Sequence, residues 1–328
     1  MKSLAFLLLF FCFSAFGAET ESAKIFLEKL SKSLRELNFT TSFVVVKNNQ
    51  VAPYHWLHGI GKDDQELEIL TRLNGSRRDV LRKGNIVSYI EPEKEPFSVV
   101  SNSIQGPIPA IFREEISQLE DNYRFISVGR SRVLGRVAQL VRIVGKDKYR
   151  FSYWLWLDQQ TGLLLKMAVV TRKGQVLEQV QFTHIEVNDT LSESLDKFQL
   201  ADLPAITKIN PLIKNQEFQW QVGWLPRGFV EVKSNTHKLS EYNQVEDKSV
   251  EFVMFSDGLI DVSVYVNPSK EKFMAAEYAS DGATLVFNHI LQGIEVGIVG
   301  DIPLITARKI AESIIASSGN SKKQTQVN

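Results

Sequence analysis

The stretch YRFSYWLWL at residues 149–157, followed by LLLKMAVV at residues 163–170, decides the fold. In the first stretch every second residue is apolar on one parity, while the other parity carries Arg150, Ser152, Trp154 and Trp156. This period of two is typical of a β-strand. A turn at residues 158–162 leads into the second stretch, whose unbroken apolar run predicts a strand buried on both faces.

Strand patterns continue on both sides of this pair. Asn74-Gly75 is a hairpin signal, and in residues 176–187 the apolar parity changes between Phe182 and Ile185, which predicts a β-bulge. Further strands are predicted at residues 39–46, 67–73, 86–90, 97–100, 125–128 and 137–144. The pattern indicates a large antiparallel sheet.

Helical spacing occurs in three places. Residues 19–37 carry apolar side chains at steps of three and four and form one amphipathic helix. A short second helix is expected from Ile108 to Leu119, after Pro107 and Pro109. A last helix opens at Pro303, where proline suits the first turn, and runs through Ile314.

The length of 328 residues predicts two domains. Prolines 204 and 211 lie in a stretch without clear periodicity, which is typical of a linker. We therefore expect a large N-terminal domain at residues 18–200, a linker at 201–215, a C-terminal domain at 216–318 and a polar tail at 319–328. Hairpins around residues 256–259 and 291–293, with the last helix, make the C-terminal domain a smaller α+β unit. The fold class is α+β.

The N-terminus has the pattern of a secretory signal peptide. Lys2 precedes an apolar run at residues 4–13, which is too short to span a bilayer, and small residues follow. Ala15 and Gly17 favour cleavage after Gly17, so residues 1–17 are predicted to be removed on export. Cys12 is the only cysteine and would leave with them, so no disulfide or thiol chemistry is expected. A lipid anchor at Cys12 is disfavoured, because small residues normally precede a lipidated cysteine.

Enzyme motifs are absent from the sequence. His55 and His58 are three residues apart, so on a strand they point to opposite faces and cannot share a metal ion. The segment GRSRV at residues 129–133 fails the last position of a nucleophile elbow. We expect neither a cofactor, a metal nor a catalytic residue, although a dyad assembled from distant residues stays open.

Charge is balanced overall, with 38 Lys and Arg against 38 Asp and Glu, which argues against a nucleic-acid coat. Two stretches are nevertheless basic, at residues 72–83 and 124–150. Arginines beside strands rich in Trp and Tyr could receive phosphate or carboxylate groups of a ligand. The alternative is an ordinary solvated face of the sheet.

Several stretches together resemble one family, the periplasmic sigma-E factor regulatory proteins called RseB or MucB. They occur in the same order and at similar spacing across both predicted domains. In the first they are LNGSRRDV (73–80), SYIEP (88–92), EPF (95–97), YRFISVGR (123–130), VRIV (141–144), YRFSY (149–153) and EQ (178–179); in the second they are WLPRGF (224–229), FSDGL (255–259), IVGDIP (298–303) and ARKIAE (307–312).

The resemblance implies a two-domain periplasmic binding protein. Its large domain would be an open antiparallel half-barrel with covering helices, similar to the lipoprotein carriers LolA and LolB. The smaller domain would bind the periplasmic part of the anti-sigma factor RseA or MucA and protect it from cleavage by DegS. By this protection the family would act as a negative regulator of the envelope stress response. Lipopolysaccharide or a related lipid would release the anti-sigma factor from the complex.

Site residues follow from apolar character and charge. For a lipid we expect Phe43, Val45, Tyr89, Phe97, Ile111 and Phe112 as lining and Arg77, Arg78 and Arg82 as phosphate contacts. For the anti-sigma factor we expect the last helix together with Trp224, Pro226, Arg227 and Phe229, of which the apolar members could equally be core. A lipid or lipoprotein carrier is the alternative function, and an envelope hydrolase is a third. Homo-oligomerisation stays open.

Overall fold

The computed structural model describes residues 13–207, 218–238 and 249–316. The chain divides into two compact units, unit 1 at Met1–Asn210 and unit 2 at Pro211–Asn328. Of the segments predicted from sequence, residues 1–12 of the signal peptide, 208–215 of the linker and the tail at 319–328 lie outside the described residues. In the described part of the chain, no helix is both long and apolar enough to cross a membrane.

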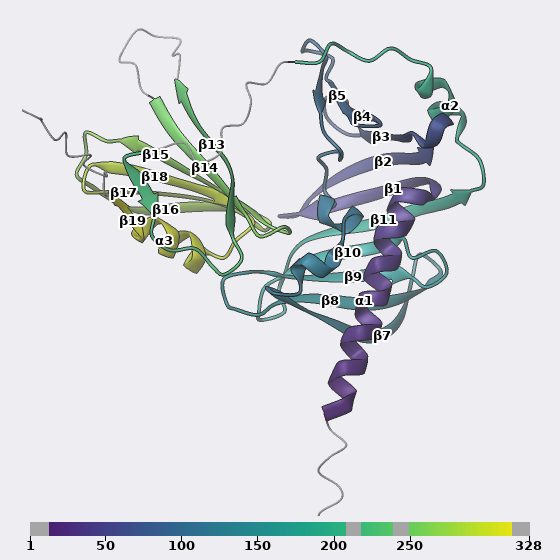
Figure 1. Cartoon of the computed structure of the whole chain (residues 1–328), viewed down its shortest axis with the longest axis horizontal. Helices are drawn as coiled ribbons and strands as arrows, with labels where there is room; N and C mark the ends of the chain where they lie inside the picture. The colour runs from purple at the N-terminus through teal and green to yellow at the C-terminus, as the bar shows by residue number, and fades with distance from the viewer. Residues whose placement is uncertain (1–12, 208–217, 239–248, 317–328) are drawn as a thin grey trace, which may run out of the picture. The chain divides into compact units, whose positions relative to one another are not determined.

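Unit 1 is built on one open antiparallel sheet (Figure 1). Along the chain its first six strands form one meander and its last five form another, and β1 pairs with β11 to join them. The strands are β1 (Asn38–Lys47), β2 (Gln50–Ile60), β3 (Glu66–Arg72), β4 (Arg78–Lys83), β5 (Ile86–Ile90), β6 (Phe97–Val100), β7 (Tyr123–Val133), β8 (Arg136–Gly145), β9 (Ser152–Asp158), β10 (Leu164–Val170) and β11 (Val176–Asn188). The predicted antiparallel sheet is confirmed.

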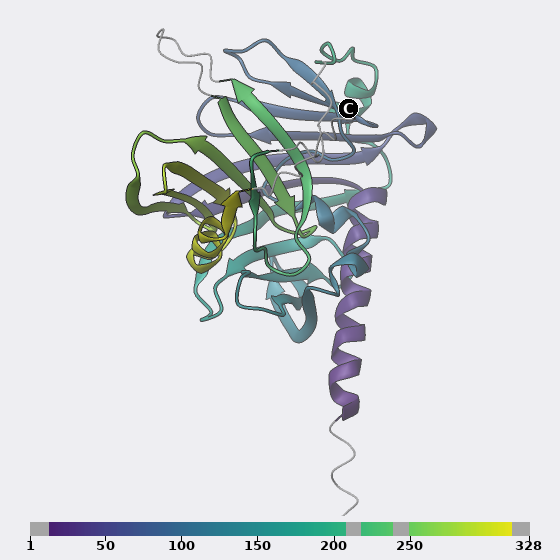
Figure 2. The ribbon, with the colours of Figure 1, turned by 60° about the vertical axis from the view of Figure 1, so that its left-hand side comes forward.

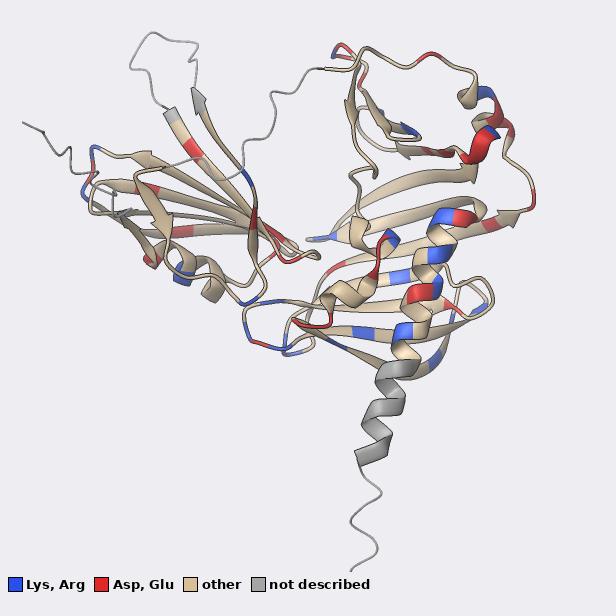
Figure 3. Ribbon diagram, viewed as in Figure 1, with Lys and Arg blue, Asp and Glu red and all other residues tan. Residues whose placement is uncertain are grey.

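Helix α1 (Phe13–Glu36) crosses one face of this sheet, as Figures 1 and 2 show. The helix side chains that are buried follow a helical spacing, namely Ala23, Leu27, Leu30 and Leu34. Each buried leucine contributes about 1.5–3 kcal/mol relative to an exposed one. Most exposed residues of the described helix surface are charged, visible as blue and red bands in Figure 3. The predicted amphipathic helix is confirmed.

The deciding stretch behaves largely as expected. Tyr153, Leu155 and Leu157 of β9 are buried, while Trp154 and Trp156 on the opposite face are half-buried. The strand begins at Ser152, so residues 149–151 lie before it. The bulge predicted in β11 is also present, because the pairing with β1 skips Thr183.

The expected helix from Ile108 to Leu119 is instead two 3-10 turns, η2 (Ala110–Arg113) and η3 (Ile116–Leu119). Glu114 has extended backbone angles, φ −102° and ψ −174°, and separates the two turns. Ile111, Phe112, Ile116 and Leu119 of the segment are still buried, so its amphipathic spacing reflects packing and not a continuous helix.

Helix α2 (Glu193–Gln199) covers the other face of the sheet near β2 and β3. Leu57, Leu67, Leu195 and Phe198 form the core there. This short helix was not predicted from the sequence. It packs on the face of β2 and β3 that carries Leu57 and Leu67, whereas Glu68 is on the opposite face, where Arg113 of η2 contacts it.

Unit 2 contains an antiparallel sheet in the order β13-β14-β15-β18-β17-β16 and a separate two-stranded sheet of β12 and β19. Both predicted hairpins are confirmed, as β14–β15 and β17–β18. Edge strand β16 was not predicted, because almost all its residues are exposed and it lacks apolar alternation. Helix α3 ends at Glu312, before the predicted Ile314, which belongs to β19. The elements are β12 (Trp220–Val222), β13 (Val230–Lys238), β14 (Ser249–Ser256), β15 (Asp261–Pro268), β16 (Phe273–Asp281), β17 (Thr284–Leu291), β18 (Ile294–Gly300), α3 (Leu304–Glu312) and β19 (Ile314–Ala316).

Candidate ligand pocket and partner-facing residues

A pocket of about 350 Å³ lies on the sheet between β2 and β5 and is bordered by residues 105–107. Cross-strand register builds its floor: Leu70, Val80 and Tyr89 are successive neighbours on β3, β4 and β5. A second row joins Tyr54, Arg72 and Arg78 on β2, β3 and β4. The volume is within the range of about 300–1,000 Å³ that is common for small-molecule sites. The two guanidinium groups share the pocket with the carboxylates of Asp79 and Glu91, and Arg78 pairs with Glu91 at 3.4 Å. A ligand with an apolar body would pack on the tyrosine rings, and an anionic group of that ligand would have to compete with Glu91 for Arg78.

A smaller apolar cavity of about 20 Å³ adjoins this pocket and shares Leu70, Gly106 and Pro107 with it. Phe43, Trp56 and Leu34 line its other sides. A cavity of this size holds about one water molecule and no acyl chain. Space for a chain here would require the segment from Ile104 to Arg113 to move away from the sheet.

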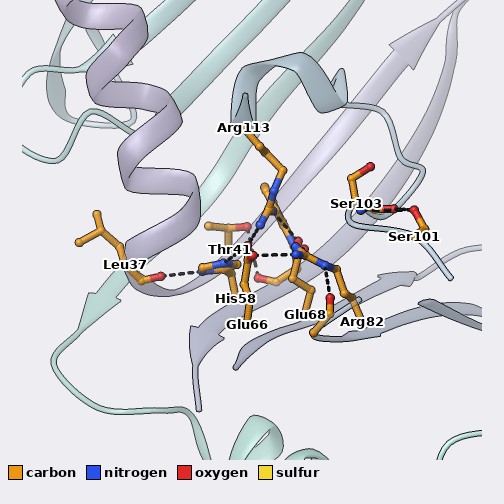
Figure 4. Close-up of polar contacts among 11 residues, drawn as sticks. Leu37, Thr41, His58, Glu66, Glu68, Arg82, Ser101, Ser103 and Arg113 are labelled. Carbon is orange, nitrogen blue, oxygen red and sulfur yellow. Dashed lines mark hydrogen bonds and ion pairs between the residues drawn. The ribbon is translucent and has the colours of Figure 1, made fainter. Parts of the chain in front are cut away.

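A buried ion cluster fastens that segment to the sheet (Figure 4). Glu68 on β3 accepts hydrogen bonds from Arg82 Nη1 at 2.8 Å and from Arg113 Nη1 at 2.9 Å. Glu66 accepts from Arg82 Nη2 at 2.7 Å and also forms an ion pair with Arg113. Since Arg113 comes from η2 and the carboxylates from β3, the cluster joins the two elements. Two guanidinium groups balance two carboxylates.

His58 lies at the edge of this cluster and is buried. Its Nδ1 is 2.7 Å from the Leu37 carbonyl oxygen, just after α1, and its Nε2 is 3.0 Å from Glu66 Oε1. The pKa of His58 is lowered to about 4, mainly by burial. The positive charges of Arg113 and Arg82 also lower it, while the negative charge of Glu68 and the hydrogen bond to the Leu37 carbonyl oppose the shift. His55 pairs with Ser42 on the other face of β2, so the two histidines point apart as expected.

The structure brings some of the expected lipid residues together and separates others. Tyr89 and Arg78 line the pocket, and Phe97 stacks on Tyr89 with ring centroids 5.2 Å apart. Phe43 lines the small cavity. Val45 is half-buried and Ile111 and Phe112 belong to the core, while Arg77 is exposed and pairs with Asp79.

Arg82 is in a different position from the one expected. It is buried, and its guanidinium holds both Glu66 and Glu68. It cannot take a phosphate without breaking these ion pairs. Sequence reasoning missed its partners, as well as Tyr54 and Arg72 of the pocket. One signal was present: Glu66, Glu68 and Leu70 share one parity of a predicted strand, which places the two carboxylates beside a core residue.

In unit 2 the expected partner residues divide into core and surface. Pro226 and Phe229 are buried. Trp224 is half-buried, with Lys309 Nζ of α3 4.0 Å from its ring centroid and Ser313 Oγ accepting from its backbone N–H at 3.0 Å. Arg227 is exposed. Of the residues expected to bind the anti-sigma factor, a partner could therefore reach Trp224, Arg227 and the exposed side of α3.

Among the described residues, no group of three His, Cys, Asp or Glu side chains is placed to hold a metal ion. The pocket offers charge, shape and hydrogen bonds to a ligand, whereas the charges of the ion cluster are paired with one another.

Known proteins resemble both units. Two family models match the chain, the MucB/RseB N-terminal domain over residues 22–205 and the MucB/RseB C-terminal domain over residues 214–315. The sigma-E factor regulatory protein RseB of Escherichia coli K12 is 31% identical over 302 residues, which cover 92% of this chain and 93% of that protein. The sigma factor AlgU regulatory protein MucB of Pseudomonas aeruginosa PAO1 is 28% identical over 319 residues, covering 96% and 98%.

Solved structures agree with these matches. A structure of the P. aeruginosa MucA/MucB complex aligns with a TM-score of 0.71 at 26% identity, covering 90% of this chain and 99% of that one. A crystal structure of MucB in complex with MucA(peri) gives 0.69 at 27% identity, covering 90% and 98%. The expected fold class, a large antiparallel sheet with helices and a smaller α+β unit, is confirmed. The chain belongs to the MucB/RseB family of sigma factor regulatory proteins.

Proposed function

We propose that this protein is a negative regulator of a sigma-E-type envelope stress response and binds the periplasmic segment of an anti-sigma factor of the RseA/MucA kind. The observation that carries the proposal is that both family domains are present in order, and that MucB bound to MucA aligns with 90% of this chain. A regulatory, binding-protein family accounts for the absence of enzyme motifs from the sequence.

Protection of the anti-sigma factor needs complementary surface and no catalytic group. An unfolded periplasmic segment is a substrate for DegS as long as its cleavage site is accessible. Binding of that segment removes the accessible form in proportion to the occupancy of the complex. Trp224 and Arg227 of unit 2 are proposed to contact the segment, since aromatic and arginine side chains dominate binding energy in interfaces.

Lipopolysaccharide or a related lipid is proposed to release the anti-sigma factor. The pocket on β2–β5 supports this, because Tyr54, Tyr89 and Arg72 line a space of about 350 Å³. Arg78 also lines it but pairs with Glu91, so a lipid phosphate would have to displace that carboxylate to reach it. For release, the lipid must bind the free protein more tightly than the complex. By linkage the anti-sigma segment must then weaken lipid binding by the same factor.

We also propose a periplasmic location, reached through cleavage of residues 1–17 as a signal peptide. The domain boundaries at 18–200 and 216–318, with a linker at 201–215, belong to the same proposal.

Complex formation tests the proposal. The full chain without residues 1–17 is titrated into the purified periplasmic segment of RseA or MucA by calorimetry. We expect a one-to-one complex that Trp224→Ala and Arg227→Ala each weaken at least tenfold. Lys272→Ala, an exposed cation of unit 2 outside the proposed contact, is the matched control and should bind like the wild type. Absence of any complex would contradict the function; equal binding by all three variants would contradict only the assigned surface.

A further inference from the structure

A second, strongly basic pocket lies on unit 1 at the ends of β8, β9 and β10. Its volume is about 270 Å³. The charged side chains that line it are five cations and one carboxylate, namely Arg124, Arg142, Lys146, Arg150, Arg172 and Asp147. Figure 3 shows Lys and Arg in blue on the ribbon of this sheet.

This basic pocket is on the opposite face of the sheet from α1. Arg124 alternates with the buried Tyr123 and Phe125 on β7, and Arg142 alternates with the buried Val141 and Ile143 on β8. Alternate residues of a strand point to opposite faces. The basic pocket is therefore separate from the candidate ligand pocket, because Tyr54 and Leu70 of that pocket are on the face of the sheet that α1 covers.

The positive charge of the basic pocket is largely uncompensated. Its only carboxylate, Asp147, forms an ion pair with Arg150 and accepts a hydrogen bond from the backbone N–H of Tyr149 at 2.8 Å. Within the described ranges, none of Arg124, Arg142 and Arg172 forms an ion pair with a carboxylate. Cations gathered without counter-charge repel one another, so an anion in the pocket would stabilise the arrangement.

Arg142 is held in place but is not satisfied. Its guanidinium carbon lies 4.3 Å from the ring centroid of Trp154, over the face of the indole. Stacking uses the face of a guanidinium and leaves its in-plane N–H groups available as donors. Arg142 Nε is buried, and no residue that the structure describes lies within hydrogen-bond distance to accept from it. Buried donors are nearly always paired, so an unpaired one beside a pocket indicates a missing acceptor.

We propose that this basic pocket binds a phosphate monoester group, with Arg142 as the central donor and Arg124 and Arg172 as flanking cations. A phosphate dianion offers several acceptor oxygens and matches the fork geometry of arginine, which explains both the excess charge and the unpaired Nε. The group could be carried by a lipid headgroup or by a free phosphate ester. This inference goes beyond the proposed function and does not depend on binding of an anti-sigma factor.

Binding is measured by calorimetry at constant ionic strength, on the full chain without residues 1–17. The ligands are inorganic phosphate, glucosamine 1-phosphate, and vesicles of phosphatidylcholine with or without phosphatidic acid. The variants are Arg142→Gln and the exposed Arg124→Gln. Arg132→Gln is the matched control, because it removes the same charge from an exposed position on β7 outside the pocket. The indole N–H resonance of Trp154, assigned by its loss in Trp154→Phe, reports where the ligand binds and whether the variants are folded.

We expect at least one phosphate-bearing ligand to bind and to shift the Trp154 resonance. Arg142→Gln and Arg124→Gln should each weaken it at least tenfold, and Arg132→Gln less than twofold. Binding of the two soluble ligands alone would identify a free phosphate ester, and binding of phosphatidic acid vesicles alone would identify a lipid headgroup. No binding of any of them, an equal loss in Arg132→Gln, or a Trp154 resonance that stays unchanged at saturation would overturn the proposal.

Discussion

Arg113→Met should destabilise unit 1 far more than the loss of an ordinary surface charge. Arg113 is only 7% exposed and contacts Glu66 and the fully buried Glu68. Methionine keeps most of the side-chain volume but removes the guanidinium, so the half-buried Glu66 and the buried Glu68 remain with Arg82 alone. Removing one partner of a buried ion pair costs about 3–5 kcal/mol.

The loss in the free energy of unfolding has an upper bound, because the carboxylate left without its arginine can take up a proton. For a glutamate of ordinary pKa this costs about 1.4 kcal/mol per pH unit above about 4.3, or about 4 kcal/mol at pH 7. The electrostatic loss at pH 7 should therefore not exceed about 4 kcal/mol. It should shrink by about 1.4 kcal/mol for each unit by which the pH is lowered toward 5.

Hydrogen exchange of the β3 amides in graded urea, read by mass spectrometry, measures this free energy for unit 1 alone. Arg77→Met is the matched control, since Arg77 pairs with Asp79 at an exposed position and should contribute less than about 1 kcal/mol. Adding Glu66→Gln to Arg113→Met restores charge balance and should recover at least half of the loss. A loss equal to that of the control, or one that does not change with pH, would refute the reasoning.

Three further predictions concern stability. The pKa of His58 is lowered to about 4 in the folded chain, whereas the unfolded chain binds the proton near pH 6.5, so the free energy of unfolding should fall by about 2 kcal/mol between pH 7.5 and pH 5. His58→Gln should flatten this pH dependence in urea titrations. A wild type that gains stability on acidification would mean that Glu66 keeps the ring protonated. Gly162→Ala should lower the melting temperature clearly more than Gly174→Ala. Both glycines have positive φ, but a Cβ at Gly162 would lie 2.6 Å from the Cγ of Lys29 on α1, whereas a Cβ at Gly174 would meet nothing within 4 Å. Equal losses in melting temperature would contradict this packing. Leu27→Ala, at a fully buried position, should lower the free energy of unfolding by about 2–5 kcal/mol, measured by denaturant titration. Ile25→Ala, at a position that is 55% exposed, should lower it by less than about 0.5 kcal/mol. Similar losses in the two variants would contradict the placement of α1.

The main architecture was predictable because its signals are local. The alternation around Trp154, the hairpin turns and the parity change at Thr183 each follow from period-two geometry within one strand or one pair. The helical spacing of residues 19–37 is equally local. These features depend on neighbouring residues, and the structure places them as expected.

The missed features depend on residues far apart in the sequence. Glu68 is fully buried and Glu66 is half-buried, although both follow an acidic run at residues 63–64. Their counter-charges come from β4 and from η2, and only the folded sheet brings these together. Arg82 could therefore not be separated from Arg77 and Arg78 by charge alone. The break at Glu114 likewise depends on how η2 packs on the sheet.

Cleavage of the purified periplasmic segment of RseA or MucA by activated DegS tests the central claim most directly. The rate is measured without this protein, with it, and with it after lipopolysaccharide is added. The account predicts strong protection at saturating protein and recovery of cleavage with lipid. Cleavage at the unprotected rate in the presence of saturating protein would contradict it.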